Sequence, residues 1–185
     1  RDPETLVRYW AVPGQEGYTH ILGGLEKDGE TGAISTDPDN HHHMDTLRAE
    51  KVARIPVPDL QVEGDADDAD LLIVGFGSTY GHLHAAMTAL RRQGHKVALA
   101  QMKYINPLPA NTAEVLLRYK KVVVAEQNLG QLAALLRIRI NGFAPYQLNR
   151  VYGQPFRVDK LVAIFADIIS GKTKADGATF ASWMI

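Results

Sequence analysis

The sequence predicts an α/β fold in which a mostly parallel sheet is covered by helices on both faces. Residues 71–75 form an apolar run without polar alternation, which is typical of a strand covered on both sides. Glycines follow this run, and apolar residues then recur at helical spacing at Leu83, Ala86, Met87 and Leu90. Strand and helix patterns keep alternating almost to the end of the chain, which favours parallel pairing through crossover helices.

The first part of the chain is predicted to be irregular and to end in one helix. Residues 1–36 contain glycine, proline and scattered charge without a clear period. Asp37 and Pro38 are typical of a helix N-cap and its first helical position, and the helix is expected to run to about Arg54. Residues 56–70 contain two prolines and an acidic stretch, so we expect a solvated linker there.

Residues 71–170 are predicted to form the compact part of the chain. Ser78 or Thr79, Asn111 and Asp159 are expected to cap the helices that follow them, because their side chains accept from free backbone amides. Residues 171–185 are expected to be a frayed tail. The expected elements are, in order, strands at 71–75, 96–101, 121–126 and about 145–151, with helices at 82–93, 111–119 and 131–140 between them and a last helix from Asp159.

Composition excludes several classes of function. The net charge is -1 and basic residues never exceed two in a row, so nucleic-acid binding is not expected. The chain has no cysteine, which excludes disulfides, thiolate zinc sites and thiolate-bound iron–sulfur clusters within it. No apolar run approaches the roughly 20 residues that span a bilayer, and no signal-peptide pattern is seen, so we expect a cytoplasmic protein. Because the first residue is Arg1, we expect the chain to be a piece of a longer polypeptide.

Three motifs invite a functional interpretation that their spacing does not support. The glycines from Gly75 to Gly81 are spaced one residue too widely for a dinucleotide fingerprint, and the second strand lacks the expected acidic residue. A tight structural turn or a subunit contact is therefore favoured over phosphate binding. Residues 170–173 lack the first glycine of a P-loop. Residues 41–43 are three adjacent histidines that point in different directions on a helix, so no metal site is expected.

Glu126 is the most interesting single residue, because it closes a buried strand just before a glycine turn. Ligands and partners meet open parallel sheets at the carboxyl ends of their strands. This carboxylate could bind, catalyse or cap the next helix, and a structural or interface role is favoured. No catalytic residue is predicted. The candidate interface or ligand loops comprise Gly75, Gly77, Ser78, Thr79, Tyr80, Gly81, Asn106, Pro107, Glu126, Asn128, Gly130 and Gln131.

Five motifs occur in a fixed order and together resemble a known family. They are Gly23-Gly-Leu-Glu-Lys-Asp-Gly, Asp37-Pro-x-Asn-His with Met44, Arg48 and Lys51, Gly75-Phe-Gly-Ser-Thr-Tyr-Gly, Asn106-Pro-Leu-Pro, and Glu126-x-Asn-Leu-Gly-Gln-Leu. Over residues 1–168 the chain resembles the alpha subunit of 2-oxoacid:ferredoxin oxidoreductases, most closely the 2-oxoglutarate type. Phe76 replaces a tryptophan and Gln127 a methionine often found in that family, which we interpret as packing changes.

The resemblance implies a role within a larger enzyme. It implies that residues 1–55 end a pyrimidine-binding-type domain and that residues 71–170 are a transketolase-C-terminal-like domain. The family decarboxylates a 2-oxoacid on thiamine diphosphate, passes electrons through iron–sulfur clusters to ferredoxin and forms an acyl-CoA. Its thiamine diphosphate, Mg²⁺ and cluster are held mainly by a beta subunit, so this chain alone is expected to bind none of them and to be inactive. The segment is expected to support subunit assembly and the active-site environment.

Two other functions remain open at this point. The chain could be the C-terminal domain of a transketolase or of a 2-oxoacid dehydrogenase beta subunit, which share the fold. Residues 23–28 and the Asn-His pair that follows argue against it, since they resemble the ferredoxin-linked family. The chain could also be a stand-alone Rossmann-like module that binds a nucleotide through residues 75–82.

Overall fold

The computed structural model describes residues 1–20 and 23–173, and these divide into two compact units. Unit 1 comprises residues 1–57, and unit 2 begins at Pro58. No helix among the described residues is both long enough and apolar enough to cross a membrane.

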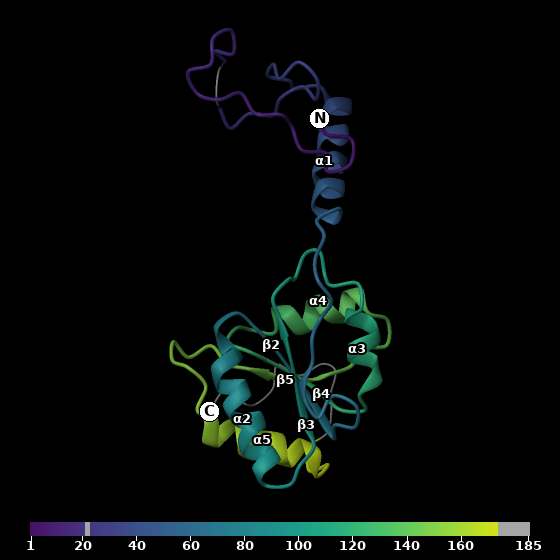
Figure 1. The fold of residues 1–185 in the computed structure, drawn as a ribbon, viewed down its shortest axis with the longest axis vertical. Helices are drawn as coiled ribbons and strands as arrows, with labels where there is room; N and C mark the ends of the chain where they lie inside the picture. Colours follow the sequence, from purple (N-terminus) through teal and green to yellow (C-terminus); the bar gives the residue numbers. More distant parts are fainter. Residues whose placement is uncertain (21–22, 174–185) are drawn as a thin grey trace. The chain divides into compact units, whose positions relative to one another are not determined.

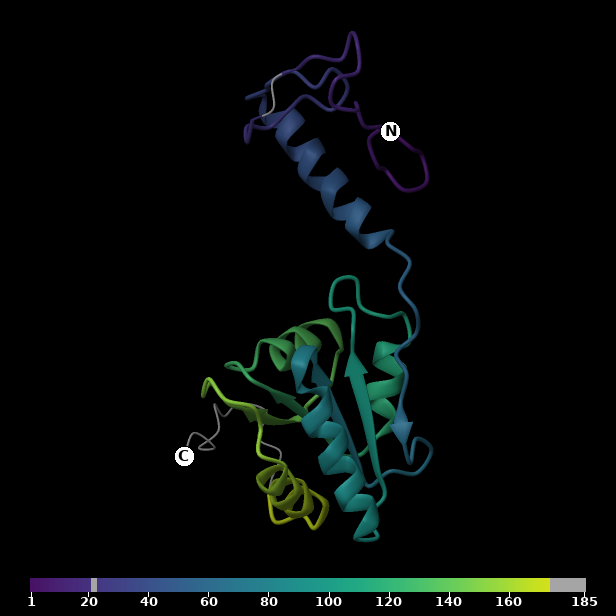
Figure 2. The same ribbon diagram turned by 60° about the vertical axis from the view of Figure 1, so that its left-hand side comes forward.

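Unit 2 is a five-stranded sheet with helices on both faces (Figures 1 and 2). The strand order is β1-β3-β2-β4-β5, in which β2 to β5 are parallel and β1 pairs antiparallel with β3. This architecture confirms the predicted fold class. The strands are β1 (Glu63–Gly64), β2 (Leu71–Phe76), β3 (Val97–Met102), β4 (Val122–Glu126) and β5 (Tyr146–Asn149), and the helices are the 3-10 turn η1 (Gly77–Thr79), α2 (Tyr80–Arg92), α3 (Thr112–Arg118), α4 (Gln131–Arg139) and α5 (Val158–Ile169).

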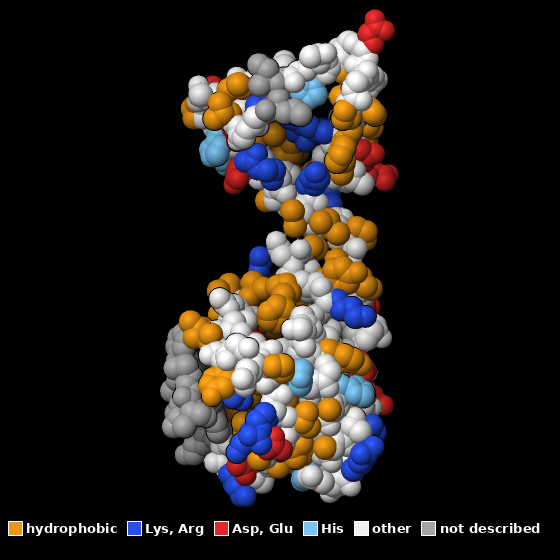
Figure 3. All heavy atoms as spheres, turned by 90° about the vertical axis from the view of Figure 1, so that its left-hand side faces the viewer, with side chains coloured by type: hydrophobic (Ala, Val, Ile, Leu, Met, Phe, Trp, Pro, Cys, Tyr) orange, Lys and Arg blue, Asp and Glu red, His pale blue; other side chains and the backbone are white. Residues whose placement is uncertain are grey.

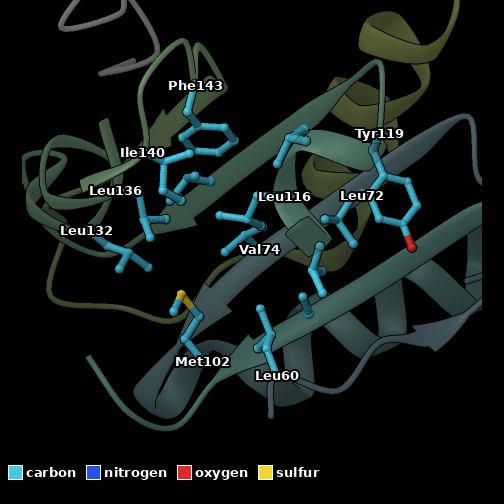
Figure 4. Packing of buried hydrophobic residues seen from close by; sticks show 14 of the residues in the cluster. Leu60, Leu72, Val74, Met102, Leu116, Tyr119, Leu132, Leu136, Ile140 and Phe143 are labelled. Atoms are coloured by element: carbon cyan, nitrogen blue, oxygen red, sulfur yellow. The ribbon is translucent and has the colours of Figure 1, made fainter. Parts of the chain in front are cut away.

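Side chains alternate between the two faces of the sheet and so supply two separate cores. Leu72 and Val74 of β2 point to the face covered by α3 and α4, where they pack in a cluster with Leu116 and Leu136 (Figure 4). Ile73, between them, faces α2 and α5 in a second cluster. Because both faces are covered, the central strands must be apolar throughout, which is why the sequence shows runs rather than alternation.

The prediction of a solvated linker over residues 56–70 is partly wrong, since Glu63 and Gly64 form the edge strand β1. Gly64 has a φ of 86°, and a Cβ there would lie 2.5 Å from the carbonyl oxygen of Val97. The next residue, Asp65, accepts hydrogen bonds from Nε and Nη2 of Arg91 at 2.8 and 3.1 Å, and these hold its pKa below the usual value. The carboxylate therefore fastens the strand to α2.

One predicted capping hydrogen bond is confirmed. Thr79 and Asn111 occupy the N-cap positions of α2 and α3 as predicted, but their side chains make no capping hydrogen bond, and Asp159 is not an N-cap. Asp37 accepts a hydrogen bond from the amide of Asn40 at 2.8 Å and caps α1 (Pro38–Ala53). Thr79 instead donates its hydroxyl to the carbonyl oxygen of Phe76 at 2.8 Å, because the chain enters α2 through η1. Asn111 is bonded elsewhere, to both backbone groups of Leu60 at 2.8 and 3.1 Å.

The N-cap of the last helix lies two residues earlier than predicted. Arg157 occupies its N-cap position, and Asp159 lies inside the first turn, where it pairs with Arg157 at 2.7 Å instead of capping. The expected tail from residue 171 lies outside the described residues from residue 174 onward.

Unit 1 consists of loops around α1, and Met44 is the one buried apolar side chain among its described residues. Figure 3 shows orange apolar side chains at the surface of this unit beside blue Lys and Arg side chains. The loops contain two turns of the same construction, and both have the sequence Asp-x-Glu-Thr. Asp2 accepts from the amide and hydroxyl of Thr5 at 2.7 and 2.8 Å, and Asp28 accepts from those of Thr31 at the same distances.

Candidate functional site

The loops that follow the parallel strands of unit 2 all emerge at one edge of the sheet, because the four strands run in the same direction. After β2 the chain moves to one side to form β3 and then to the other side to form β4 and β5. The reversal places a topological switch point between the ends of β2 and β4, where open α/β sheets bind ligands and partners. The three loops predicted as candidate sites meet at this edge.

The loop after β2 is built around close packing rather than around an open cradle. A Cβ at Gly75 would lie 2.3 Å from Cδ1 of Leu83 and 2.9 Å from Oγ1 of Thr79, so only glycine lets the strand approach α2 this closely. Gly77 follows with a φ of 61°, and its carbonyl accepts from Nε2 of Gln101 on β3 at 3.0 Å. Ser78, Tyr80 and Gly81, which follow, are exposed.

The side chain of Glu126 at the end of β4 is fully buried, and its carboxylate accepts hydrogen bonds from backbone amides of α4. Its two oxygens accept hydrogen bonds from the amides of Leu132 and Ala133 at 2.8 and 2.9 Å. These amides belong to the first turn of the helix and have no partner within it. A negative charge at this position also complements the helix dipole. The geometry therefore makes Glu126 an acceptor for the start of α4.

The turn between Glu126 and α4 is equally specific. Oδ1 of Asn128 accepts from the amides of Gly130 and Gln131 at 2.7 and 3.1 Å. Gly130 has a φ of 95°, and a Cβ there would lie 2.7 Å from Nδ2 of Asn149 on β5. Of the predicted residues in this turn, the side chain of Gln131 is the one that faces solvent.

Large side chains project into solvent from each of these loops. Tyr80 follows β2 and is 39% exposed, Tyr104 follows β3 and is 42% exposed, and Leu129 follows β4 and is 52% exposed. Asn106 is exposed beside Tyr104, and Pro107 is half-buried. Exposed aromatic and aliphatic side chains gathered at one edge are typical of an interface.

The loop after β5 belongs to the same edge, although it was not among the predicted candidates. Val151 and Tyr152 are exposed there, and the guanidinium of Arg150 lies 4.4 Å from the centre of the Tyr152 ring. The amide of Arg150 donates to the carbonyl oxygen of Glu126 at 3.0 Å, which ties this loop to the neighbouring strand. This loop could have been predicted from the sequence, because Tyr152 lies just beyond the fourth predicted strand. We call Tyr80, Tyr104, Leu129, Val151 and Tyr152 the carboxyl-edge surface.

Tyr80 also contacts the edge strand that the sequence did not predict. Its hydroxyl donates to Oε2 of Glu63 at 3.0 Å, and this bond raises the pKa of the tyrosine. The ring of His84 lies 5.5 Å away, with Nε2 at 3.8 Å from the same carboxylate. The contact orients Tyr80 at the border of the carboxyl-edge surface.

In unit 1, polar contacts join the glycine-rich loop to α1. Nδ1 of His41 lies 2.9 Å from Oε2 of Glu26, and this contact lowers the pKa of the glutamate. Asn40 accepts from the amide of Gly29 at 3.1 Å and donates to the carbonyl of Lys27 at 3.3 Å. Hydrogen bonds therefore join the motif that begins at Gly23 to the motif that begins at Asp37. Among residues 1–20 and 23–173, no three His, Asp or Glu side chains are grouped so that they could hold a metal ion.

Comparison with known proteins gives consistent matches. Residues 69–158 match the family model for the pyruvate:ferredoxin oxidoreductase core domain II. The 2-oxoglutarate oxidoreductase subunit KorA of Mycobacterium tuberculosis is 52% identical over 172 residues, which cover 93% of this chain and 26% of that protein. The alpha subunit of 2-oxoacid:ferredoxin oxidoreductase 2 from Aeropyrum pernix is 33% identical over 143 residues, which cover 74% of this chain and 22% of that protein.

A solved structure agrees with these relatives. The 2-oxoglutarate:ferredoxin oxidoreductase from Magnetococcus marinus, with 2-oxoglutarate, coenzyme A and succinyl-CoA bound, superposes with a TM-score of 0.76 at 33% identity. The match covers 90% of this chain and 29% of that chain. The chain therefore spans about a quarter of the length of the first relatives that it matches.

Proposed function

From the premise that this chain belongs to the family of 2-oxoacid:ferredoxin oxidoreductase alpha subunits, as its motifs predicted, we propose that it serves the oxidative decarboxylation of a 2-oxoacid to an acyl-CoA. The proposed 2-oxoacid is 2-oxoglutarate, and the proposed electron acceptor is ferredoxin. The observation that carries the proposal is the 52% identity to the Mycobacterium tuberculosis subunit over 93% of this chain.

The composition of this chain is consistent with a partner subunit that holds the cofactors of this reaction. The chain has no cysteine, and its described residues offer no group of metal ligands, so we derive no step at an iron–sulfur cluster or at Mg²⁺ from its own residues. When bound in the complete enzyme, thiamine diphosphate supplies the carbanion-stabilising chemistry that decarboxylation requires. We propose that a beta subunit holds these groups.

The proposed task of this chain is to support assembly around that centre. Glu126 and Gly130 fix the start of α4, and Gly75 fixes α2 against β2, so the loops between them are held by the sheet. Rigid elements hold a binding surface more precisely than free loops do. The carboxyl-edge surface is then presented to the beta subunit or to neighbouring domains of the alpha subunit. Residues 1–55 and 71–170 keep their proposed places as the end of a pyrimidine-binding-type domain and a transketolase-C-terminal-like domain.

Co-elution of this chain with a matching beta subunit tests the proposal. We expect a complex at micromolar concentration on size-exclusion chromatography and no turnover of 2-oxoglutarate by this chain alone. Replacing Leu129 with Asp should weaken the complex at least about tenfold, because it places a charge in an apolar contact. Ile138→Asp is the matched control, since Ile138 is 82% exposed at the far end of α4. Loss of binding in neither variant, or no complex at all, would contradict the proposed role.

A further inference from the structure

The loops at the carboxyl edge of unit 2 carry charge of one sign only. Four loops form this edge, and they comprise residues 77–81, 103–111, 127–130 and 150–156. The charged side chains among them are Lys103 and Arg150, and none of the 21 acidic residues of the chain lies in these loops. Glu126, which adjoins the third loop, is buried and accepts from the amides of α4. The four loops therefore present positive charge without a carboxylate of their own.

Neither of these cations is neutralised by the part of the chain that the structure describes. Across residues 1–20 and 23–173, no ion pair includes Lys103 or Arg150. Lys103 is exposed and Arg150 is half-buried. A partner's carboxylate would therefore meet both cations without displacing a carboxylate of this chain.

The loop that carries Arg150 is held in place before any partner binds. The guanidinium of Arg150 lies over the ring of Tyr152, 4.4 Å from its centre. Nε2 of Gln127 donates to the carbonyl oxygen of Gln154 at 2.6 Å, which ties this loop to the turn after β4. Because the group is already positioned, binding loses less side-chain entropy than it would with a mobile arginine.

The two cations occupy matched places on either side of the sheet. Lys103 is the residue after β3, and Arg150 is the residue after β5. The registers of the three parallel pairings bring the ends of these two strands to the same level. β2 and β4 lie between them, and neighbouring strands are about 4.8 Å apart, so the two backbones are separated by about 14 Å.

The space between the two cations is apolar. Tyr80 follows β2 and Leu129 follows β4, and both side chains are exposed. At the border of the surface, the carboxylate of Glu63 is engaged by the hydroxyl of Tyr80 at 3.0 Å. An apolar centre with charged groups at its rim is the usual anatomy of a protein–protein interface. The arrangement thus fits a protein surface rather than one small anion.

We propose that the carboxyl-edge surface binds an acidic face of the beta subunit, on which carboxylates flank an apolar centre. One carboxylate contacts Lys103, and another pairs with the guanidinium of Arg150. The inference rests on the assembly proposed above and adds to it the chemistry of the partner. The apolar centre supplies most of the affinity, and the charges select the partner and speed its association.

Zero-length cross-linking tests these contacts in the complex of the whole chain with a matching beta subunit. A carbodiimide joins a lysine amine to a carboxylate that touches it, and mass spectrometry then locates the joined residues. We expect Lys103 to be joined to an Asp or Glu of the beta subunit. Lys120 is the matched control, because it is exposed and precedes β4 at the opposite edge, so it should not be joined. Absence of any link from Lys103 to the beta subunit would overturn the proposal.

Charge variants test Arg150, which the carbodiimide does not join. Arg150→Gln should weaken the complex at least about tenfold and Lys103→Gln about threefold, whereas Arg150→Lys keeps the charge and should lose less. Arg139→Gln and Lys120→Gln remove the same charges from exposed positions at the opposite edge and should leave the Kd within about twofold of the original. Raising the salt concentration should weaken the original complex more than that of Arg150→Gln.

The outcomes separate this inference from the proposed assembly. Equal Kd values for Arg150→Gln, Lys103→Gln and the two control variants would overturn the acidic face and leave the assembly standing. No complex with the unaltered chain would overturn both. Circular dichroism of each variant confirms that a lost complex is not a lost fold.

Discussion

The two units of this protein hold their backbones in different ways. In unit 2, apolar runs from four parallel strands pack between helices on both faces, and the central side chains of β2 are completely buried. In unit 1, Met44 is the one buried apolar residue that is described, and side chain–backbone hydrogen bonds fix the loops instead. Burial of apolar surface stabilises unit 2 without depending on pH, whereas the polar turns of unit 1 depend on ionised carboxylates.

The difference also bears on the proposed role of unit 2. Unit 2 presents its loops from a rigid sheet edge, which suits a permanent protein contact. Unit 1 consists instead of loops held by hydrogen bonds to Asp2, Asp28 and Asn40. The comparison predicts that changes in one unit leave the other folded. Unfolding followed by circular dichroism reports chiefly on unit 2, and Trp10 fluorescence in the Trp183→Phe background reports on unit 1.

The largest expected effect comes from Glu126→Ala. The substitution leaves the amides of Leu132 and Ala133 buried without their acceptor and should destabilise unit 2 by about 3 kcal/mol. Glu126→Gln keeps one acceptor oxygen and should cost less. Glu114→Ala, at an exposed carboxylate in the first turn of α3, is the control and should cost under about 1 kcal/mol. Urea unfolding measures the free energy of unfolding of all three variants. If the Trp10 signal of Glu126→Ala were lost at the same urea concentration as its circular dichroism signal, the two units would not unfold independently.

Gly75→Ala should have a smaller effect on the same unit. The added Cβ would meet Leu83 and Thr79 at 2.3 and 2.9 Å, and overpacking of this kind costs about 1–3 kcal/mol. Gly81→Ala provides the control, because no atom lies within 4 Å of its Cβ position and alanine favours the helix. The melting temperature should therefore fall for Gly75→Ala and stay level or rise for Gly81→Ala. Equal melting temperatures would show that β2 and α2 are less closely packed than described.

Acid should act on unit 1 before unit 2. Hydrogen bonds from Thr5, His41 and Thr31 lower the pKa values of Asp2, Glu26 and Asp28 respectively. Carboxylates with lowered pKa values stabilise the folded state above their unfolded pKa of about 4, and this stabilisation is lost as the pH falls through their folded pKa values. Between pH 7 and 2, the Trp10 signal should change at a higher pH than the circular dichroism signal does. The opposite order would contradict the inference that these ionised carboxylates stabilise the folded loops of unit 1.

The smallest expected effect is at the second of the matched turns. Gly32 has a φ of 74°, and no atom lies within 4 Å of its Cβ position, so Gly32→Ala should cost only the backbone strain of about 1 kcal/mol. Leu6 occupies the corresponding place in the first turn with a φ of 58°, which shows that a side chain is tolerated there. Gly24→Ala, at a glycine without positive φ, is the control. Trp10 fluorescence during urea unfolding should shift for the first variant and hardly for the second.

Sequence patterns predicted most of unit 2 because its elements are marked by local signals. The run from Leu71 and the helical spacing of Leu83 and Leu90 place a strand and a helix within a few residues of their observed bounds. The capping hydrogen bonds predicted for Thr79, Asn111 and Asp159 do not form, for a common reason. Each side chain can bond more than one partner, and the partner chosen depends on what the fold brings near.

The role of Glu126 shows the same limit at the candidate site. Its place after a buried strand marked it as important, but the two amides that it accepts from became its partners only when α4 packed against β4.

By itself the sequence determined the parallel α/β fold, the family and the three loops at the carboxyl edge, since apolar periodicity and ordered motifs are local properties of a chain. The tertiary structure alone decided that Glu63 and Gly64 form an edge strand and that Asn111 binds Leu60. These features join residues far apart in the chain or depend on which of several polar partners is near. Such choices follow from three-dimensional packing, which no local pattern records.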